Sequence, residues 1–335
     1  MIKLRLLPGI FTCLTALLSA QTVYTVKMAT VAPEGSLWMR EFHKFDKDLS
    51  TTTGGQIKFR VYPNAVQGGE KDILRKMQLG QLDIGTFTGV GLGELVHEVR
   101  ILDLPFLFKN SAEVDYVYGK LFEEFQQKFI EKGFYLAGWA EVGLIYLLTR
   151  NPVSSPADFK DVKMWLWKGD PLARATFEEL KISAIPLDIT DVHTALQTGL
   201  IDGVYISPYG ALALQWYTKT KYMLNYPLTN SVGAVLITQR KLNSLPADLR
   251  EVFITKTKIY MRQIVLASRA ENIESIKVLQ DNGIVLTNPK DQQAVREFDL
   301  AGQRTRTKLT GSLYSAELLN RILQYLDEYR KQNAK

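Results

Sequence analysis

The start of the chain alternates apolar and polar positions in the way that half-buried strands do. Residues 23–31 read VYTVKMATV, which predicts a strand. Residues 36–51 predict a helix, because their large apolar side chains fall on one side: Leu37, Met39, Phe42, Phe45 and Leu49. Gly54 and Gly55 then turn the chain into IKFRVYP, a second strand. This βαβ opening predicts an α/β lobe with parallel strands.

One pattern occurs twice. Residues 72–85 read DILRKMQLGQLDIG, and residues 191–204 read DVHTALQTGLIDGV. In both, an Asp lies eight residues before a Gly, a Gln lies two before it, and a second Asp lies three after it. Each unit predicts a helix that ends at a left-handed Gly and turns into a buried strand. Such joints are common in α/β proteins, but the matching offsets favour two similarly built lobes.

The longest helical pattern runs from Pro246 to Asn282 and contains no proline after its first residue. Its apolar residues recur near a 3.6-residue period, and they include Leu249, Phe253, Ile259, Ile264, Ile273, Ile276 and Leu279. At about 1.5 Å per residue this helix is roughly 50 Å long, which is more than the width of one lobe. We therefore expect it to span both lobes. A final helix over 316–331 is expected to pack back onto the body.

Length and charge narrow the classes of function. The chain has 335 residues, enough for about two domains. The formal net charge is +6, but the basic residues are dispersed, which argues against a nucleic-acid surface. Lys3 and Arg5 precede the apolar stretch 10–18, so residues 1–20 read as a signal peptide, and we expect a periplasmic protein. Acylation of Cys13, as in a lipoprotein, is the weaker alternative.

Enzyme chemistry finds little support in the sequence. The three histidines, His43, His97 and His193, are far apart and form no zinc-binding spacing. The chain contains no GxSxG elbow and no phosphate-binding loop, and the Gly-rich run 89–93 lacks the spacing of a dinucleotide fingerprint. No carboxylate cluster demands a metal. We therefore expect a binding protein with no cofactor, no metal and no catalytic residue.

Several segments resemble the solute-binding proteins of tripartite ATP-independent periplasmic (TRAP) transporters, in order and spacing over 25–286. They are QGGE at 67–70, LPFLF at 104–108, Trp139 with Gly143, SPADFKDVK at 155–163 and TALQTGLIDG at 194–203. The resemblance implies a periplasmic-binding-protein clamp, with two α/β lobes joined by hinge strands and by one long helix. It also implies that the lobes close over a ligand, which is then delivered to TRAP membrane subunits.

Within this fold we expect lobe I to comprise 21–148 plus 233–270, and lobe II to comprise 149–232 plus 271–335. The helix 246–282 is shared between them. A sensor receptor in place of a transporter is an alternative client.

The chain departs from the family where its relatives bind carboxylates. In most relatives, an arginine on the equivalent strand binds the ligand's carboxylate through two parallel N–H groups. In this chain that strand reads KMWLW, and Trp165 occupies the position of the arginine. A second arginine often follows the Gly143 position, where this chain has Leu144, and the usual polar stretch after Asp-Gly reads VYISP, 204–208. Because burying an unpaired carboxylate costs several kcal/mol, we predict a neutral, mainly apolar or aromatic ligand. This profile is similar to a TRAP subgroup associated with tetratricopeptide-repeat partner proteins.

The candidate ligand contacts are mainly aromatic residues expected at the cleft. They are Trp165, Tyr205, Tyr209, Trp167, Trp38, Ile145, Asn230 and Phe87. Plain core packing is the competing interpretation for Trp165 and Trp167, and Trp38 could simply anchor its helix. We expect Glu70 to start a helix. The alternative of a carboxylate ligand needs a cation, for which Lys168 or Arg174 is the candidate.

Overall fold

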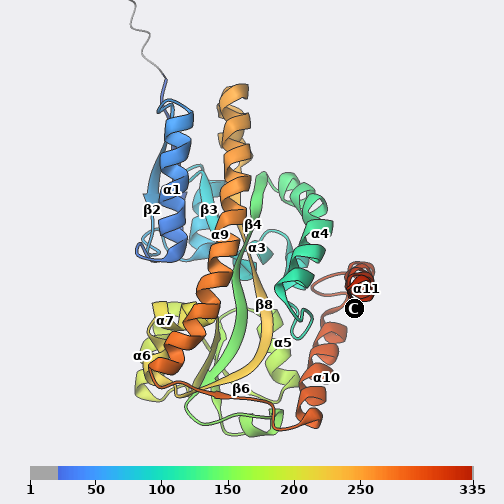
Figure 1. Cartoon of the computed structure of the whole chain (residues 1–335). Helices are drawn as coiled ribbons and strands as arrows, with labels where there is room; N and C mark the ends of the chain where they lie inside the picture. Colours follow the sequence, from blue (N-terminus) through green and yellow to red (C-terminus); the bar gives the residue numbers. More distant parts are fainter. Residues whose placement is uncertain (1–21, 334–335) are drawn as a thin grey trace, which may run out of the picture.

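The computed structural model of the protein describes residues 22–333, which fold into two α/β lobes (Figure 1). The predicted signal peptide and Cys13 lie outside the described residues. The long helix α9 (Ala247–Asp281) runs alongside both lobes, as its length predicts. Within the described part of the chain, no helix combines the length and apolar character needed to cross a membrane.

The strands of the described residues belong to one sheet, in the order β2-β1-β3-β8-β4-β7-β5-β6, with β9 paired to β8. They are β1 (Tyr24–Ala29), β2 (Ile57–Tyr62), β3 (Ile84–Thr88), β4 (Phe134–Thr149), β5 (Lys163–Trp167), β6 (Ser183–Leu187), β7 (Gly203–Ile206), β8 (Tyr222–Thr238) and β9 (Val285–Thr287). β1 pairs in parallel with β2 and β3, and β5 pairs in parallel with β6 and β7. The predicted parallel βαβ opening is therefore confirmed.

The two halves of the sheet are built alike. In the first lobe the order is β2-β1-β3 followed by the long strand β8, and in the second it is β6-β5-β7 followed by the long strand β4. The duplicated sequence units occupy equivalent places, because α2 (Glu70–Gln78) leads into β3 and α6 (Val192–Thr198) leads into β7. Gly80 and Gly199 end these helices with φ of 81° and 76°. The predicted left-handed glycines are thus present in both lobes.

Two long antiparallel strands, β4 and β8, connect the lobes. The first half of β4 pairs with the part of β8 that borders β3, and its second half borders β7. The register between β4 and β8 shifts at three places, between Leu136 and Gly138, Glu141 and Gly143, and Ile145 and Leu147. Such irregularities bend and twist a strand, so these strands form the hinge. We place the lobe boundary in this irregular part of the sheet.

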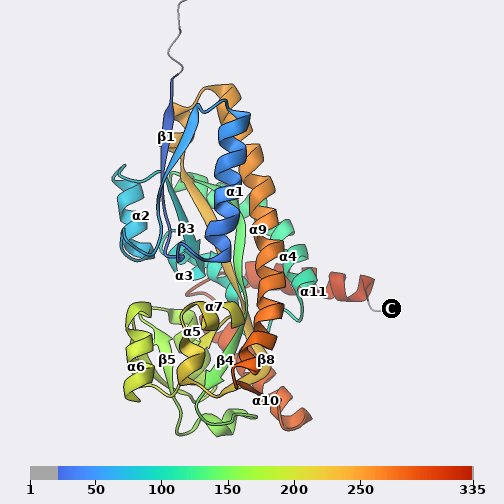
Figure 2. The same cartoon turned by 60° about the vertical axis from the view of Figure 1, so that its left-hand side comes forward.

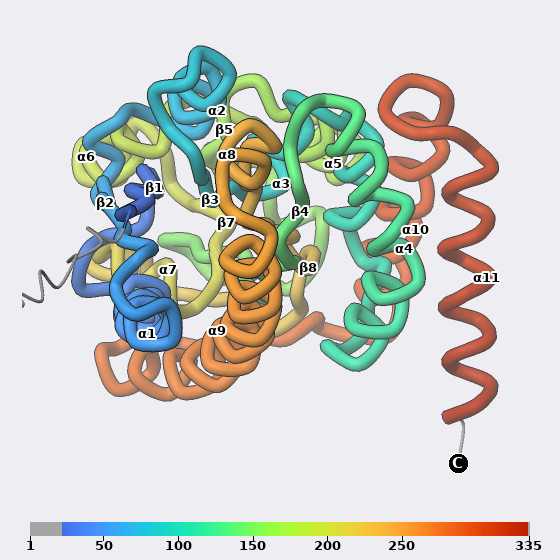
Figure 3. Tube along the Cα trace, turned by 90° about the horizontal axis from the view of Figure 1, so that it is seen from above, coloured from blue at the N-terminus to red at the C-terminus, as the bar shows by residue number. Residues whose placement is uncertain are grey.

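The remaining helices cover the sheet and connect its strands. They are α1 (Leu37–Thr52), α3 (Gly89–Gly93), α4 (Ser111–Glu131), α5 (Pro171–Glu179), α7 (Pro208–Ala213), α8 (Gln239–Ser244), α10 (Gln292–Leu309) and α11 (Ala316–Gln332). The short 3₁₀ segment η1 (His97–Asp103) lies between α3 and α4. From above, α9 lies between α1 and α4, with α11 outside α4 (Figure 3). α1 buries the apolar side chains that its pattern marked, beginning at Leu37 after the N-cap Ser36.

α11 packs against the first lobe, whereas the sequence analysis assigned residues 271–335 to the second lobe. Leu318, Ile322 and Leu326 share one apolar core with α4. The carboxylate of Glu113 on α4 accepts two hydrogen bonds from Arg330, at 2.7 and 2.8 Å. α10 stays with the second lobe, beside α5. The chain therefore crosses back between α10 and α11, which the helical pattern alone does not indicate.

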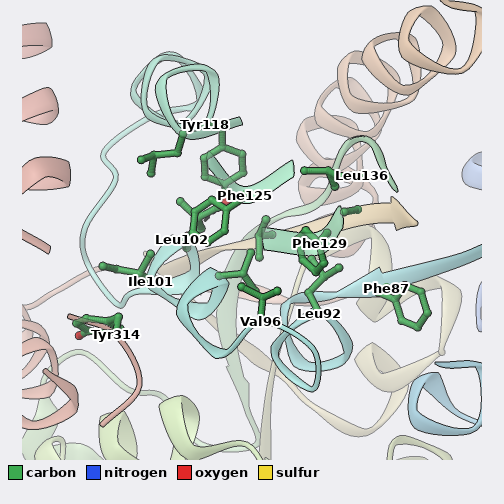
Figure 4. Packing of buried hydrophobic residues seen from close by; sticks show 14 of the residues in the cluster. Phe87, Leu92, Val96, Ile101, Leu102, Tyr118, Phe125, Phe129, Leu136 and Tyr314 are labelled. Atoms are coloured by element: carbon green, nitrogen blue, oxygen red, sulfur yellow. Dashed lines mark hydrogen bonds between the residues drawn. The ribbon is translucent and has the colours of Figure 1, made fainter. Parts of the chain in front are cut away.

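The core of the first lobe is a large apolar cluster between the sheet, η1 and α4 (Figure 4). It contains Phe125 and Phe129 of α4, Leu136 of β4, and Ile101 and Leu102 of η1. This cluster fixes η1 firmly in the first lobe, which matters because η1 carries charged residues that face the cleft.

Candidate functional site

A cavity of about 320 Å³ lies between the two lobes. Its walls come from the carboxyl ends of parallel strands in both lobes, with Ala32 after β1, Thr88 at the end of β3, Trp167 at the end of β5 and Ser207 after β7. In open α/β sheets this is the edge at which ligands bind. Figure 2 shows the arrangement, with α7 at the top of the second lobe and below the lower end of α1.

One wall of the cavity is aromatic. Trp165 stacks on Tyr205 with ring centroids 5.0 Å apart and lies 5.6 Å from Trp167. Trp216 also packs against Trp165 in a T-shaped arrangement, with ring centroids 5.1 Å apart. The side chain of Trp165 is 2% exposed, and its Nε1–H donates to the carbonyl of Leu187 at 3.0 Å. Trp165 is thus both a core residue and a wall of the cavity, so the two interpretations considered for it are compatible.

Opposite charges meet at another side of the cavity. Arg100 of η1 is 5% exposed, and its Nη1 and Nη2 donate to the two carboxylate oxygens of Asp170 at 3.0 and 3.1 Å. Its Nε donates to Asp103 at 2.9 Å. Asp170 caps α5 by accepting from the backbone N–H groups of Leu172 and Ala173. Because η1 belongs to the first lobe and α5 to the second, this bidentate ion pair joins the lobes across the cleft.

Burial governs the protonation of this cluster. Burial alone would lower the pKa of Arg100, but Asp170 and Asp103 raise it above its ordinary value, so the guanidinium stays charged. Burial raises the pKa of Asp103 to about 6, against the lowering effect of Arg100 and of the hydrogen bond from Val232. One buried guanidinium therefore faces the carboxyl groups of Asp103 and Asp170. Among the described residues that line the cavity, Arg100 is the sole basic side chain.

A buried carboxylate and two close glycines shape the loop after β3. Glu70 accepts hydrogen bonds from the backbone N–H groups of Thr88 and Gly91, both at 2.9 Å. A Cβ on Gly91 would lie 2.2 Å from the Glu70 carboxylate, and one on Gly89 would lie 1.9 Å from that of Asp103. The glycines of this run therefore leave the space in which the carboxyl groups of Glu70 and Asp103 pack against the loop. Glu70 begins α2, as the sequence predicts, and is not among the cavity's lining residues.

A second contact crosses the cleft at α7. The hydroxyl of Tyr209 accepts a hydrogen bond from the backbone N–H of Leu37, at the N-terminus of α1, at 2.9 Å. The backbone N–H of Tyr209 donates to Asn272 of α9 at 3.1 Å, and the Asn272 amide donates to the carbonyl of Val142 in the hinge strand at 3.0 Å. Asn272 therefore links the shared helix, the hinge and a wall of the cavity.

Six of the eight candidate ligand contacts line the cavity: Trp165, Tyr205, Tyr209, Trp167, Trp38 and Ile145. The other two lie elsewhere. Phe87 packs in the first-lobe core (Figure 4), and Asn230 is buried with its amide donating to the hydroxyl of Tyr118 at 3.3 Å. Successive residues of a strand face opposite sides, so it is Thr88, Thr229 and Ser231 that reach the cavity.

The two cations proposed for a carboxylate ligand also lie outside the cavity. Lys168 is exposed and pairs with Asp188 at 3.4 Å, while Arg174 borders a separate hollow beside α10.

Sequence reasoning missed Arg100, Asp103 and Asp170. Arg100 and Asp103 lie three residues apart inside the apolar run 99–108, which indicates that both are buried. The sequence does not indicate that Asp170, 70 residues further along the chain, is the partner of Arg100. In the described part of the chain, no cluster of His, Cys, Asp and Glu is arranged to hold a metal.

Comparisons with known proteins agree with this architecture. The family model described as bacterial extracellular solute-binding protein, family 7, matches residues 28–300. A solute-binding protein of Roseobacter denitrificans is 34% identical over 198 residues, which are 57% of this chain and 60% of that relative, so the match spans less than two thirds of its length. The sialic acid-binding periplasmic protein of Vibrio cholerae is 25% identical over 85% of this chain and 88% of its own.

Solved structures share the fold. A TRAP periplasmic solute-binding protein from Desulfovibrio salexigens, with bound orotic acid, matches with a TM-score of 0.82 at 19% identity, over 91% of this chain and 99% of that chain. The matching family and the relative from Roseobacter denitrificans are both described as solute-binding proteins. Because the family model covers most of the sequence, this chain belongs to family 7 of the bacterial extracellular solute-binding proteins, the solute-binding proteins of TRAP transporters.

Proposed function

We propose that this protein is the periplasmic subunit that closes over a neutral, mainly apolar or aromatic solute and delivers it to TRAP membrane subunits. The observation that carries the proposal is the cavity between the lobes, where aromatic residues form one wall. Among residues 22–333, Arg100 is the sole cation that lines this cavity, and it is held by two acidic side chains. A periplasmic tetratricopeptide-repeat protein is a further partner implied by the resemblance of the ligand profile, and a sensor is the alternative client.

The energetics favour an apolar ligand at this wall. An aromatic solute that loses roughly 150 Å² of apolar surface to Trp165, Trp167 and Tyr205 gains about 4 kcal/mol from burial. A carboxylate placed in the same cavity would need a partner for its charge, since desolvating an unpaired ion costs several kcal/mol. Trp38, Tyr209 and Ile145 complete the proposed contact set, because they line the same space.

Binding of a carboxylate is the second candidate function. It is favoured by the relatives, whose names include sialic acid and orotic acid as ligands. With Lys168 and Arg174 outside the cavity, such a ligand would have to take Arg100 from one of its present partners. The cost of leaving Asp170 without its cation makes this the weaker candidate.

Thermal unfolding of the protein against two ligand panels tests the proposal. One panel contains C4-dicarboxylates, 2-keto acids and sugar acids, and the other contains aromatic compounds, fatty acids and neutral lipids. A ligand at a hundred times its Kd stabilises by about 2.7 kcal/mol, which shifts the midpoint by several degrees. We expect shifts with aromatic and neutral compounds. Shifts confined to the small carboxylates would overturn the proposal.

A further inference from the structure

The charge cluster at the cavity occupies an unusual position for a structural ion pair. Arg100, Asp103 and Asp170 all line the space in which the solute is held. A buried arginine beside a ligand is the group best suited to fork a carboxylate, because its N–H groups match the two oxygens. Here those N–H groups are already bonded to Asp170, with both distances close to 3 Å.

We propose that Asp170 is a specificity-determining residue, which excludes carboxylate ligands by occupying the guanidinium of Arg100. This inference rests on the proposed function and assigns the charge preference of the same cavity to one side chain. Asp170 is the partner whose removal matters, because it takes the two terminal nitrogens of Arg100, whereas Asp103 takes only Nε.

The surroundings show why Asp170 holds this arginine so firmly. Asp170 is 4% exposed, and its Oδ1 also accepts from the N–H groups of Leu172 and Ala173, at 2.9 and 3.2 Å. It is therefore fixed at the first turn of α5, where a carboxylate is favoured. Asp103 is fixed in turn by accepting the N–H of Val232 at 2.6 Å. A solute carboxylate that approaches Arg100 would meet the fixed carboxyl groups of Asp103 and Asp170, and it would find no pair of guanidinium N–H groups free to bind it.

The same geometry says how the preference could be reversed. Serine is also a good N-cap, so Asp170→Ser keeps the start of α5 while removing the carboxylate and leaving space beside Arg100. A ligand carboxylate could then take the place of the Asp170 carboxylate on Nη1 and Nη2. Arg100 would again have two carboxylate partners, one from Asp103 and one from the ligand.

The test measures Kd for acid and amide pairs with the same carbon skeleton: benzoate and benzamide, hexanoate and hexanamide, and indole-3-acetate and indole-3-acetamide. At about pH 8 all three acids are ionised. We expect Asp170→Ser to bind at least one of these carboxylates tenfold or more tightly than the wild type does. Adding Arg100→Gln to that variant should abolish the gain.

Asp188→Ser is the matched control, since it makes the same change of charge and size at an exposed residue of the same lobe, paired with Lys168. It should leave carboxylate binding as in the wild type. If Asp170→Ser does not fold, as judged by circular dichroism, Asp170→Asn replaces it, because asparagine also caps helices.

Three results would each overturn the assignment: no gain of any carboxylate in the folded Asp170 variant, an equal gain in Asp188→Ser, or a gain that survives Arg100→Gln. The amides separate this inference from the proposed function. If the wild type bound none of them while Asp170→Ser gained carboxylates, the inference would stand and the proposal of a neutral ligand would be weakened.

Discussion

Gly143 lies at an irregular point of the hinge strand, where a side chain cannot be accommodated. Its φ is +100°, and a Cβ there would lie 2.8 Å from the amide nitrogen of Asn272. That nitrogen donates to the carbonyls of Val142 and Ser268 at 3.0 and 2.9 Å, and the amide oxygen accepts from Tyr209 at 3.1 Å. A methyl group on Gly143 must therefore displace the side chain that links α9 to the hinge and to the cavity wall.

The expected cost of Gly143→Ala has two parts. An L-residue at positive φ costs about 1–2 kcal/mol, and losing the hydrogen bonds of Asn272 costs about 1 kcal/mol for each. With all three hydrogen bonds of Asn272 lost, we expect the variant to lose about 4–5 kcal/mol in free energy of unfolding. Gly133→Ala is the matched control, because Gly133 also has positive φ, +86°, but a Cβ added there would meet no atom within 4 Å. It should lose only the strain of about 1–2 kcal/mol.

Urea unfolding followed by circular dichroism measures both losses. A double-mutant cycle with Asn272→Ala isolates the contact, since Gly143→Ala should cost only its strain once the amide is gone. Equal losses for Gly143→Ala and Gly133→Ala, or no coupling to Asn272, would refute the view that this amide ties the hinge to α9.

Three further predictions follow from single contacts. Tyr209→Phe removes the hydrogen bond from Leu37 across the cleft, so it should lower the free energy of unfolding by about 1 kcal/mol. It should also raise the radius of gyration in X-ray scattering, and an unchanged radius would contradict a role of this bond in closure. Trp165→Ala should lose about 3–5 kcal/mol in urea unfolding, because it removes a fully packed ring; a loss below about 1 kcal/mol would show that the ring is not part of the core. Burial raises the pKa of Glu70 from 4.5 to about 7, so its contribution to stability is present at low pH and is lost as pH rises through that range. Glu70→Gln should flatten the fall in urea midpoint between about pH 5 and pH 7, and an unchanged slope would contradict this.

Most of the architecture follows from local sequence patterns, but the return of α11 to the first lobe does not, because it depends on packing against α4. Strand alternation at the start, the duplicated helix–Gly–strand units and the apolar period of α9 each depend on neighbouring residues, and each was confirmed. The apolar period of α9 gave a wrong prediction of burial only for individual residues. Ile259 and Ile273 fit the apolar pattern but are 48% and 73% exposed, since so long a helix is covered on different sides along its length.

The site was predictable only in part. Trp165 and Tyr205 follow from their place on strands that end at the cleft, and both line the cavity. Asn230 was expected to contact the ligand, but its neighbours Thr229 and Ser231 line the cavity instead, because the irregular pairing with β4 hides which residues face inward. Arg100 could not be recognised, since its partner Asp170 belongs to the other lobe and neither residue has a motif of its own.

We propose that this cavity prefers a neutral ligand to a charged one. The most direct test is calorimetric titration of the wild-type protein, at about pH 8, with the tightest-binding amide found among the matched pairs and with its acid. We predict that the amide binds at least tenfold more tightly, a difference of about 1.4 kcal/mol, because the acid finds no free cation beside Asp170. Tighter binding of the acid would show that the cavity accepts a carboxylate and that the proposed preference for neutral ligands is wrong.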